Sequence, residues 1–266
     1  MTVAAIIVAP APEAALRLVD GEPAIRRVAR AAWAGGAIPI LVAAPDPDGR
    51  IAAALEGTEA QIAPPSMPAI DPARWHDRVA DEILAAAQAA AAGVIGTTAV
   101  LVWPVKRSWV GPETVTSLIE AHGADRGRVI RPTFHGEAGL PTLVPIGSLE
   151  DVLAGRTAEP VTAGSGGLPR VDLGAQPRRC VATLLGEAAD NLPSRMLELG
   201  DPGTVVSGNV PREQLPAYEG PLREELPDAG LQDAPAFGSG SATDAGEGAD
   251  GDDDRVLADA NLNPEE

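Results

Sequence analysis

The sequence has few cysteines and few aromatic residues, which excludes internal disulfides and a core built from aromatic rings. One cysteine, Cys180, among 266 residues excludes an internal disulfide and fits a reducing compartment. No base lies near Cys180 in the sequence, so we interpret it as a buried thiol. Aromatic residues make up only 3% of the chain, so its core must consist mainly of Ala, Val, Leu and Ile. Such a core depends on close packing of helices against a sheet.

A long hydrophobic run is also lacking. The longest, Ala85–Ile95, is interrupted by Gln88 and Gly93 and is short of the roughly 20 residues that a membrane span requires. The N-terminus begins directly with the apolar run Thr2–Val8 and has no basic region typical of a signal peptide. We therefore predict a cytoplasmic location and no membrane partner.

Basic residues are few, and lysine occurs only once, as Lys106. The net charge is −18, and the segment Glu219–Glu266 alone holds 14 acidic residues against two arginines. No basic stripe compensates elsewhere, so nucleic acid is not an expected partner. The same segment is rich in Gly, Ser and Asp and cannot bury enough apolar area to offset its chain entropy. We predict an α/β domain over residues 1–218 and an acidic, low-complexity, disordered tail over residues 219–266.

Strand and helix patterns alternate along the predicted domain. The expected strands are Val3–Val8, Ile38–Ala43, Ala60–Ile62, Val100–Trp103, Arg128–Arg131, Thr142–Pro145 and Met196–Leu199. The expected helices are Ala24–Ala34, Arg50–Leu55, Asp71–Ala92, Gly111–Ala121, Arg178–Ala189 and Pro211–Tyr218. This alternation predicts a three-layer, Rossmann-like α/β fold whose mostly parallel sheet carries helices on both faces. The loops after Val8 and Trp103 should then meet at the carboxyl edge of the sheet, where ligands bind.

Three stretches of the sequence together resemble a known family. They are Ala4–Ala9 with the following Leu18–Ile25, then Val100–Val115, and then Ile130–Pro141. In this order and spacing they resemble the MobA-like NTP transferases, the group that contains the molybdenum-cofactor cytidylyl- and guanylyltransferases. The resemblance covers about residues 1–218. It implies a fold of nucleotidyltransferase type and a nucleotide or molybdopterin-type ligand.

The first catalytic device that the resemblance implies is a glycine-rich loop of the form LAAGxSxRMGxxK. Its backbone N–H groups approach the triphosphate while its basic residues neutralise charge. The corresponding stretch, Val8–Arg17, has no glycine and no lysine. Pro10 and Pro12 lack the N–H group, and Glu13 adds a charge of the wrong sign. Arg17 is the one candidate phosphate contact that this loop retains.

The second and third implied devices are metal-binding aspartates. Lys106 stands at the aspartate of a PVDxP-like turn, with Arg107 after it, and an ammonium group cannot ligate Mg²⁺. Ser207–Glu213 matches a late DxDTPxD-like segment, with Ser207 and Asn209 at the two aspartates. Losing these carboxylates removes the charge that holds the metal. We therefore predict no metal site and no catalytic residue, and lost or weak transferase activity.

Anion binding remains possible without the metal. We predict Arg17, Lys106 and Arg107 as residues that bind a nucleotide or pterin phosphate, although a solvated basic turn also explains Lys106 and Arg107. Trp103 and Trp109, which flank this turn, are interpreted as packing residues rather than base-stacking platforms.

The loop that shapes the second-substrate pocket in the family corresponds to His135, Gly139 and Pro141. Leu140 replaces the histidine of the family's GHP motif, and a surface-loop histidine is the interpretation that we favour for His135. The chain's three histidines, at positions 76, 122 and 135, are too far apart in sequence to indicate a zinc site.

Two alternative functions remain open at this point. The first is an active NTP transferase with rearranged ligands, in which Glu113 or Asp201 would hold Mg²⁺ and the substrate would be CTP or GTP. The second is a non-catalytic interaction module whose acidic tail binds a basic surface of a partner protein.

Overall fold

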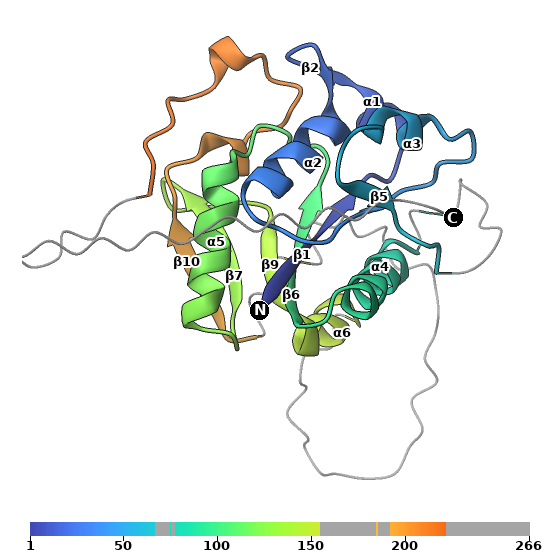
Figure 1. Ribbon diagram of the computed structural model, residues 1–266. Helices are drawn as coiled ribbons and strands as arrows, with labels where there is room; N and C mark the ends of the chain where they lie inside the picture. The colour runs from blue at the N-terminus through green and yellow to red at the C-terminus, as the bar shows by residue number, and fades with distance from the viewer. Residues whose placement is uncertain (67–74, 76–77, 155–184, 186–191, 222–266) are drawn as a thin grey trace, which may run out of the picture. The chain divides into compact units, whose positions relative to one another are not determined.

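The computed structural model describes residues 1–66, 75, 78–154, 185 and 192–221 (Figure 1). The chain divides into two units, Met1–Arg223 and Glu224–Glu266, and every described residue belongs to the first. Cys180, the predicted helix Arg178–Ala189 except for Leu185, and the tail beyond residue 221 lie outside the described residues, so their interpretation stays a prediction. Within the described part, no helix is long and apolar enough to cross a membrane.

Most strands belong to one sheet. In chain order the strands are β1 (Thr2–Val8), β2 (Leu18–Val19), β3 (Glu22–Pro23), β4 (Ile40–Ala43), β5 (Ala60–Ile62), β6 (Thr97–Pro104), β7 (Val129–Phe134), β8 (Glu137–Ala138), β9 (Thr142–Pro145) and β10 (Ser194–Glu198). Eight of them form a sheet in the order β10-β7-β9-β6-β1-β4-β5, with β8 paired to β7, while β2 and β3 form a separate hairpin. β8 and β9 run antiparallel to their neighbours and the other pairs of the large sheet are parallel, so the sheet is mostly parallel, as predicted.

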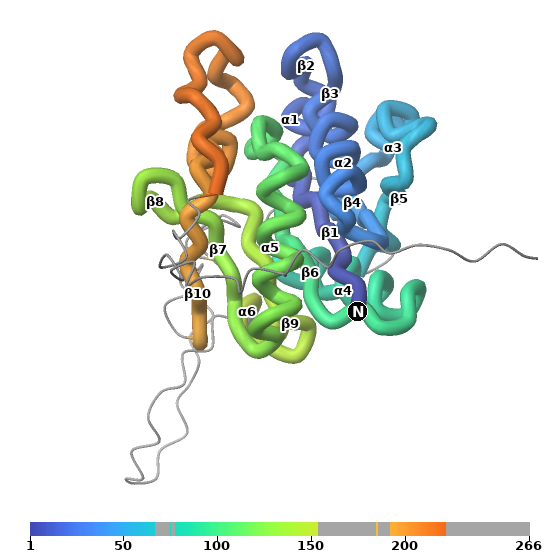
Figure 2. Tube along the Cα trace, turned by 60° about the vertical axis from the view of Figure 1, so that its left-hand side comes forward, coloured from blue at the N-terminus to red at the C-terminus, as the bar shows by residue number. Residues whose placement is uncertain are grey.

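Helices cover both faces of this sheet (Figures 1 and 2). They are α1 (Pro12–Leu16), α2 (Ala24–Ala34), α3 (Arg50–Leu55), α4 (Val79–Gly93), α5 (Pro112–Ala124) and α6 (Ile146–Ala154). Successive side chains of a strand point to opposite faces. In β1, Val3, Ala5 and Ile7 therefore pack with α1, α2, α3 and α5, whereas Ala4 and Ile6 pack with α4 and α6. The predicted three-layer α/β architecture is confirmed.

Small residues let the helices and the sheet pack closely. A core with few aromatic rings depends on such close packing. β1 is buried over its last six residues, all of them Ala, Val or Ile. A Cβ on Gly35, at the end of α2, would lie only 2.4 Å from Cβ of Val115 in α5, so glycine permits the close approach of these two helices. Among the described residues, Trp103 is the largest fully buried side chain.

Several predicted elements need correction. α2, α3, β5 and β9 have the predicted bounds, but the helix expected from Asp71 begins at Val79. Arg78, immediately before it, has φ −124, outside the α region. The Asp-Pro pair expected to start that helix lies outside the described residues. α1, α6, β8 and the β2–β3 hairpin were not expected.

The predicted last helix, Pro211–Tyr218, is wrong. Only Arg212–Gln214 forms a 3-10 turn. Pro216 has no N–H to continue a helix. Beyond it, Glu219 N donates a 2.9 Å hydrogen bond to Gly200 O, so this segment is held against the end of β10 instead.

The parallel register brings the loops of interest to one edge. Val8, the last residue of β1, pairs with Pro104, the last residue of β6, and Val105 N donates a 3.0 Å hydrogen bond to Val8 O. β10 pairs in parallel with β7, so the loops after Phe134 and Glu198 leave the sheet at the same edge. The carboxyl edge therefore carries all the segments predicted to form the site.

Candidate functional site

The connection after β1 is compact and offers few free amides. Ala9 N donates to Ala43 O at 3.0 Å, and Ala14 N and Ala15 N both donate to Ala11 O. The two prolines of this stretch have no N–H group. Between Ala9 and Ala15 only the amides of Ala11 and Glu13 remain for a ligand, so this turn cannot surround a triphosphate as a glycine-rich loop does.

Arg17 directly follows α1, as its C-cap residue, and is exposed. Its carbonyl accepts a 2.8 Å hydrogen bond from Ala24 N, which fixes the backbone here. Its guanidinium has no hydrogen bond or ion pair with any residue that the structure describes, and none joins it to Lys106. Arg17 is thus a free cation at the carboxyl edge.

The turn after β6 holds Lys106 on a rigid backbone. Arg107 N donates to Pro104 O at 2.9 Å, and the buried Trp103 indole donates to Arg107 O at 3.0 Å. Trp103 therefore has the packing role expected for it. The Lys106 side chain is exposed and forms no hydrogen bond or ion pair within the described part of the chain.

The late segment crosses directly over this turn. Gly208 N donates a 2.7 Å hydrogen bond to Lys106 O, and a Cβ on Gly208 would lie 2.1 Å from Ser108 Oγ. Ser207 and Asn209, on either side, form a tight turn in which Asn209 N lies 3.5 Å from Ser207 Oγ. The structure therefore brings Lys106 together with the Ser207–Asn209 segment, two places predicted from separate motifs.

Arg107 and Trp109 hold the two segments together. The Arg107 guanidinium donates to Val205 O, and Trp109 Nε1 donates to Val210 O at 2.9 Å. Burial lowers the pKa of Arg107, while the charge of Glu137 opposes that shift. Arg107 is half-buried and engaged with backbone, so its position suits a structural contact better than ligand binding.

The two acids considered as substitute metal ligands lie at the N-terminus of α5. Asp201 is 3% exposed and accepts hydrogen bonds from Thr114 Oγ1 at 2.6 Å, Gly111 N at 3.1 Å and Gly203 N at 2.8 Å. Burial raises the pKa of Asp201, these three hydrogen bonds lower it, and the nearby charge of Glu113 raises it further. The carboxylate is already used to join β10 to α5.

No metal centre is evident in the described ranges. Glu113 is exposed and folds back toward Gly111, where a Cβ would lie 2.7 Å from Glu113 Oε2. The described residues contain no group of three or more His, Cys, Asp or Glu side chains that could hold a metal ion. The geometry does not favour the rearranged metal site considered above.

The predicted second-substrate loop has a structural explanation for part of its sequence. A Cβ on Gly139 would lie 2.6 Å from Thr204 Cβ, and Leu140 N donates to Thr204 O at 3.0 Å. Glycine is therefore needed where this loop packs on the 3-10 turn Pro202–Thr204. The peptide bond before Pro141 is cis.

His135 lies at the tip of the β7–β8 hairpin with φ 51, in the left-handed region. Its ring stacks on Phe134 at 4.2 Å, and its Nε2 lies 3.1 Å from both carboxylate oxygens of Glu219. The exposed His135 thus contacts the start of the predicted tail rather than Lys106.

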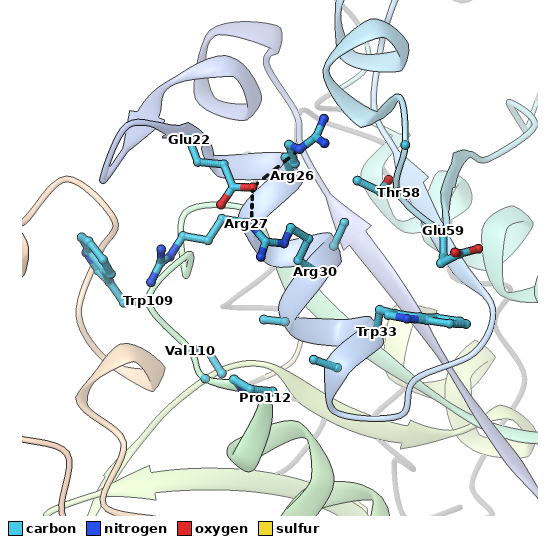
Figure 3. Close-up of a pocket in the computed structure, with 15 residues that line it drawn as sticks. Glu22, Arg26, Arg27, Arg30, Trp33, Thr58, Glu59, Trp109, Val110 and Pro112 are labelled. Carbon is cyan, nitrogen blue, oxygen red and sulfur yellow. Dashed lines mark hydrogen bonds and ion pairs between the residues drawn. The ribbon is translucent and has the colours of Figure 1, made fainter.

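A second feature was not predicted from the sequence. A groove of about 640 Å³ runs along the outer face of α2, between the α3–β5 loop and the residues before α5 (Figure 3). Arg26, Arg27, Arg30, Trp33 and Trp109 line it. Its sequence signal was the Arg26, Arg30, Trp33 spacing, which places three side chains on one helix face but is common on solvated helices.

Comparison with known proteins identifies the type of fold. No protein-family model matches the sequence, and no curated protein matches it significantly. Among solved structures, it resembles the nucleotidyl transferase Mth528 from Methanothermobacter thermautotroptrophicus, with 15% identity, a TM-score of 0.50, and coverage of 74% of this chain and 87% of that one. Rv0371c from Mycobacterium tuberculosis H37Rv is similar at 14% identity and a TM-score of 0.50, with coverage of 74% and 88%. The fold is that of the nucleotidyltransferases.

Proposed function

We propose that this protein is a nucleotidyltransferase-fold protein that binds a nucleotide or pterin phosphate without efficient Mg²⁺-dependent nucleotidyl transfer. The observation that carries this proposal is the 2.7 Å contact between Gly208 N and Lys106 O. This contact joins the backbone of Lys106 to the Ser207–Asn209 turn, where the family resemblance implies two metal-binding aspartates. The Lys106 ammonium itself has no hydrogen bond or ion pair with any described residue. An ammonium repels a divalent cation and attracts a phosphate.

The β1–α1 connection supports the loss of activity. Transfer of a nucleotidyl group requires the triphosphate to be positioned and its charge neutralised, which amide-rich loops and metals do in such enzymes. Here, Pro10 and Pro12 lack donors and three other amides are already bonded within the protein. The remaining cations, Arg17 and Lys106, can attract a phosphate but cannot align an attack on it as a metal does.

The ligand is proposed to come from the class that the molybdenum-cofactor cytidylyl- and guanylyltransferases use, a CTP- or GTP-like nucleotide or a molybdopterin-type compound. The motifs between Val100 and Pro141 support this class by resemblance. The active alternative draws less support, because Asp201 is buried and already accepts three hydrogen bonds. The tail-docking alternative and a cytoplasmic location stay predictions.

An activity assay tests the proposal. The full-length protein is incubated with CTP or GTP, Mg²⁺ and a molybdopterin acceptor, and released pyrophosphate is measured. We expect no release above the background of a protein-free control. Turnover on the order of 1 s⁻¹ or faster, an ordinary enzymatic rate, would contradict the proposal.

A further inference from the structure

The outer face of α2 carries a stripe of cations and an exposed indole. Arg26, Arg30 and Trp33 follow one another at helical spacing, opposite the buried Ile25 and Val28. The Arg30 side chain is 69% exposed and Trp33 is 47% exposed. A large aromatic ring this exposed, on a chain with so few aromatics, is available to a ligand.

Glu22 shows how this face holds an oxyanion. Its Oε1 lies 3.1 Å from Arg30 Nη1 and 3.6 Å from Arg26 Nε, so one carboxylate oxygen lies near two guanidinium groups (Figure 3). Guanidinium groups bind carboxylate and phosphate oxygens through the same donors. The Arg26–Glu22–Arg30 cluster therefore has the geometry of an oxyanion site with an internal carboxylate in it.

One of the two arginines is fixed and the other is free to adjust. Arg26 Nη1 donates to Glu56 O at 2.8 Å and to Ala54 O at 3.3 Å, which ties the guanidinium to the end of α3. Arg30 contacts only Glu22 among the residues described. A fixed cation lowers the entropy cost of binding an anion, and a free one can turn toward it.

The groove carries more positive than negative charge. Arg27 adds a third cation, held 4.7 Å from the centre of the Trp109 ring and donating to Ser108 O at 2.9 Å. Glu22 and Glu59 are the acids in the lining. Arg27 also lies 4.0 Å from Asp20 Oδ2, so displacement of Glu22 would leave Arg26 and Arg30 as the two arginines without an acidic partner among the described residues.

We propose that this groove is a second phosphate-binding site, in which Arg26 and Arg30 bind the phosphate of a small ligand in competition with Glu22. Trp33 contacts the ring when the ligand is a nucleoside phosphate. The volume of about 640 Å³ is suited to a ligand of that size. Lys106 is not among the residues that line this groove. The proposal does not depend on the proposed function.

Titration with inorganic pyrophosphate in the absence of metal tests the arginines. The full-length Lys106→Ala variant serves as the starting protein, so that the other proposed site does not contribute. Arg30→Ala should weaken pyrophosphate binding by about fivefold, the effect of one exposed charge pair, and Arg30→Lys should restore part of the loss. Arg128→Ala is the matched control, because Arg128 is similarly exposed and pairs with Asp125 at 2.8 Å in the loop between α5 and β7.

The glutamate provides the sharper test, because the site predicts a gain. Glu22→Gln keeps the side-chain shape and removes the competing charge, so pyrophosphate should bind several-fold more tightly. If Glu22→Gln and Arg30→Ala both leave the dissociation constant within about twofold of the starting protein, the cluster is only a structural ion pair and the proposal is overturned.

A Trp33 variant distinguishes the two kinds of ligand that could bring a phosphate to this groove, a nucleotide and a free phosphate compound. Trp33→Leu should weaken CTP or GTP while leaving pyrophosphate unchanged if the ligand is a nucleotide. If CTP, GTP and pyrophosphate bind with equal affinity to the starting protein and to its Trp33→Leu variant, the site binds free phosphate compounds. Failure of the Lys106 proposal would not alter either result, because these titrations contain no functional Lys106 side chain.

Discussion

Two charged residues at the carboxyl edge of the sheet have opposite surroundings. Asp201 is 3% exposed and accepts three hydrogen bonds from the protein. Lys106 has a backbone fixed by Gly208 and Pro104, but its ammonium is exposed and has no partner in the part of the chain that the structure describes. Asp201 therefore acts as a structural acceptor, while the charge of Lys106 remains free to attract an anion. The contrast between these two residues favours an anion over a divalent cation as the ligand of the Lys106 turn.

Removal of Asp201 should have the largest effect and should act on stability. Asp201→Ala leaves Thr114 Oγ1 and the amides of Gly111 and Gly203 without their acceptor, so we expect a loss of about 3 kcal/mol in the free energy of unfolding. Urea denaturation measures it. Glu120→Ala, an exposed acid of α5, is the control and should change stability by less than about 0.5 kcal/mol. An Asp201→Ala protein with unchanged stability that loses Mg²⁺ affinity would show that Asp201 is a metal ligand after all.

The contact between the two site segments is tested by Gly208→Ala. The added Cβ would meet Ser108 Oγ at 2.1 Å and Lys106 O at 3.3 Å, so the buried Ser108 side chain must rotate or the Ser207–Asn209 turn must move away from Lys106. We expect a loss of about 2 kcal/mol in stability from this overpacking, together with weaker nucleotide binding. Gly127→Ala is the matched control, since no atom lies within 4 Å of a Cβ there. Equal stability and nucleotide affinity in the two variants would place the segments farther apart than the structure has them.

The opposite end of α5 offers a second buried titratable group for comparison with Asp201. His122 is fully buried, with Nε2 3.1 Å from Thr98 Oγ1. Burial lowers the pKa of His122, the charge of Arg126 lowers it further, and Asp125 raises it. The native state therefore favours the neutral ring, and the stabilisation present above the unfolded pKa of about 6.5 is lost as the pH falls through the native value.

This linkage predicts a distinct pH dependence. The free energy of unfolding should fall more between pH 7.5 and 5.5 in the wild-type protein than in His122→Gln, measured by urea denaturation at each pH. The raised pKa of Asp201 has the opposite sign, since its contribution is present below the unfolded value of about 3.8 and is lost as the pH rises. If the free energy of unfolding depends on pH in the same way in the wild-type protein and in His122→Gln, protonation of His122 does not destabilise the native state and this prediction is wrong.

The sequence predicted the sheet and its main helices because buried strands and amphipathic helices have clear periods. Apolar runs such as Thr2–Val8 identified the central strands, and α2 was placed to the residue by its apolar stripe and following glycines. α1 was missed because five residues are too few to show a period. The helix expected at Pro211–Tyr218 is limited to the 3-10 turn Arg212–Gln214, because Leu215 is extended and Pro216 has no N–H group to continue a helix.

The candidate site also has features that the sequence predicted and features that only the structure shows. The meeting of the loops after Val8 and Trp103 followed from the rule that parallel strands share a carboxyl edge. The resemblance pointed to Lys106 and to Ser207–Asn209 separately, and only the structure brings the two segments into contact. The structural use of Arg107, Gly139 and Asp201 could not be predicted, because each depends on a partner far away in sequence. The groove along α2 was missed for the same reason, since Arg26 and Arg30 alone resemble an ordinary solvated helix face.

The metal dependence of nucleotide binding tests the central claim most directly. Dissociation constants for CTP and GTP are measured by titration calorimetry on the wild-type and Lys106→Ala proteins, each with EDTA and with Mg²⁺, and with Arg128→Ala as the control for loss of one positive charge. The account predicts that the wild-type protein binds nucleotide in EDTA, that Mg²⁺ does not strengthen binding, and that Lys106→Ala weakens it about tenfold, as expected for a lost charge-assisted hydrogen bond. Binding that requires Mg²⁺ and is unaffected by Lys106→Ala would contradict it.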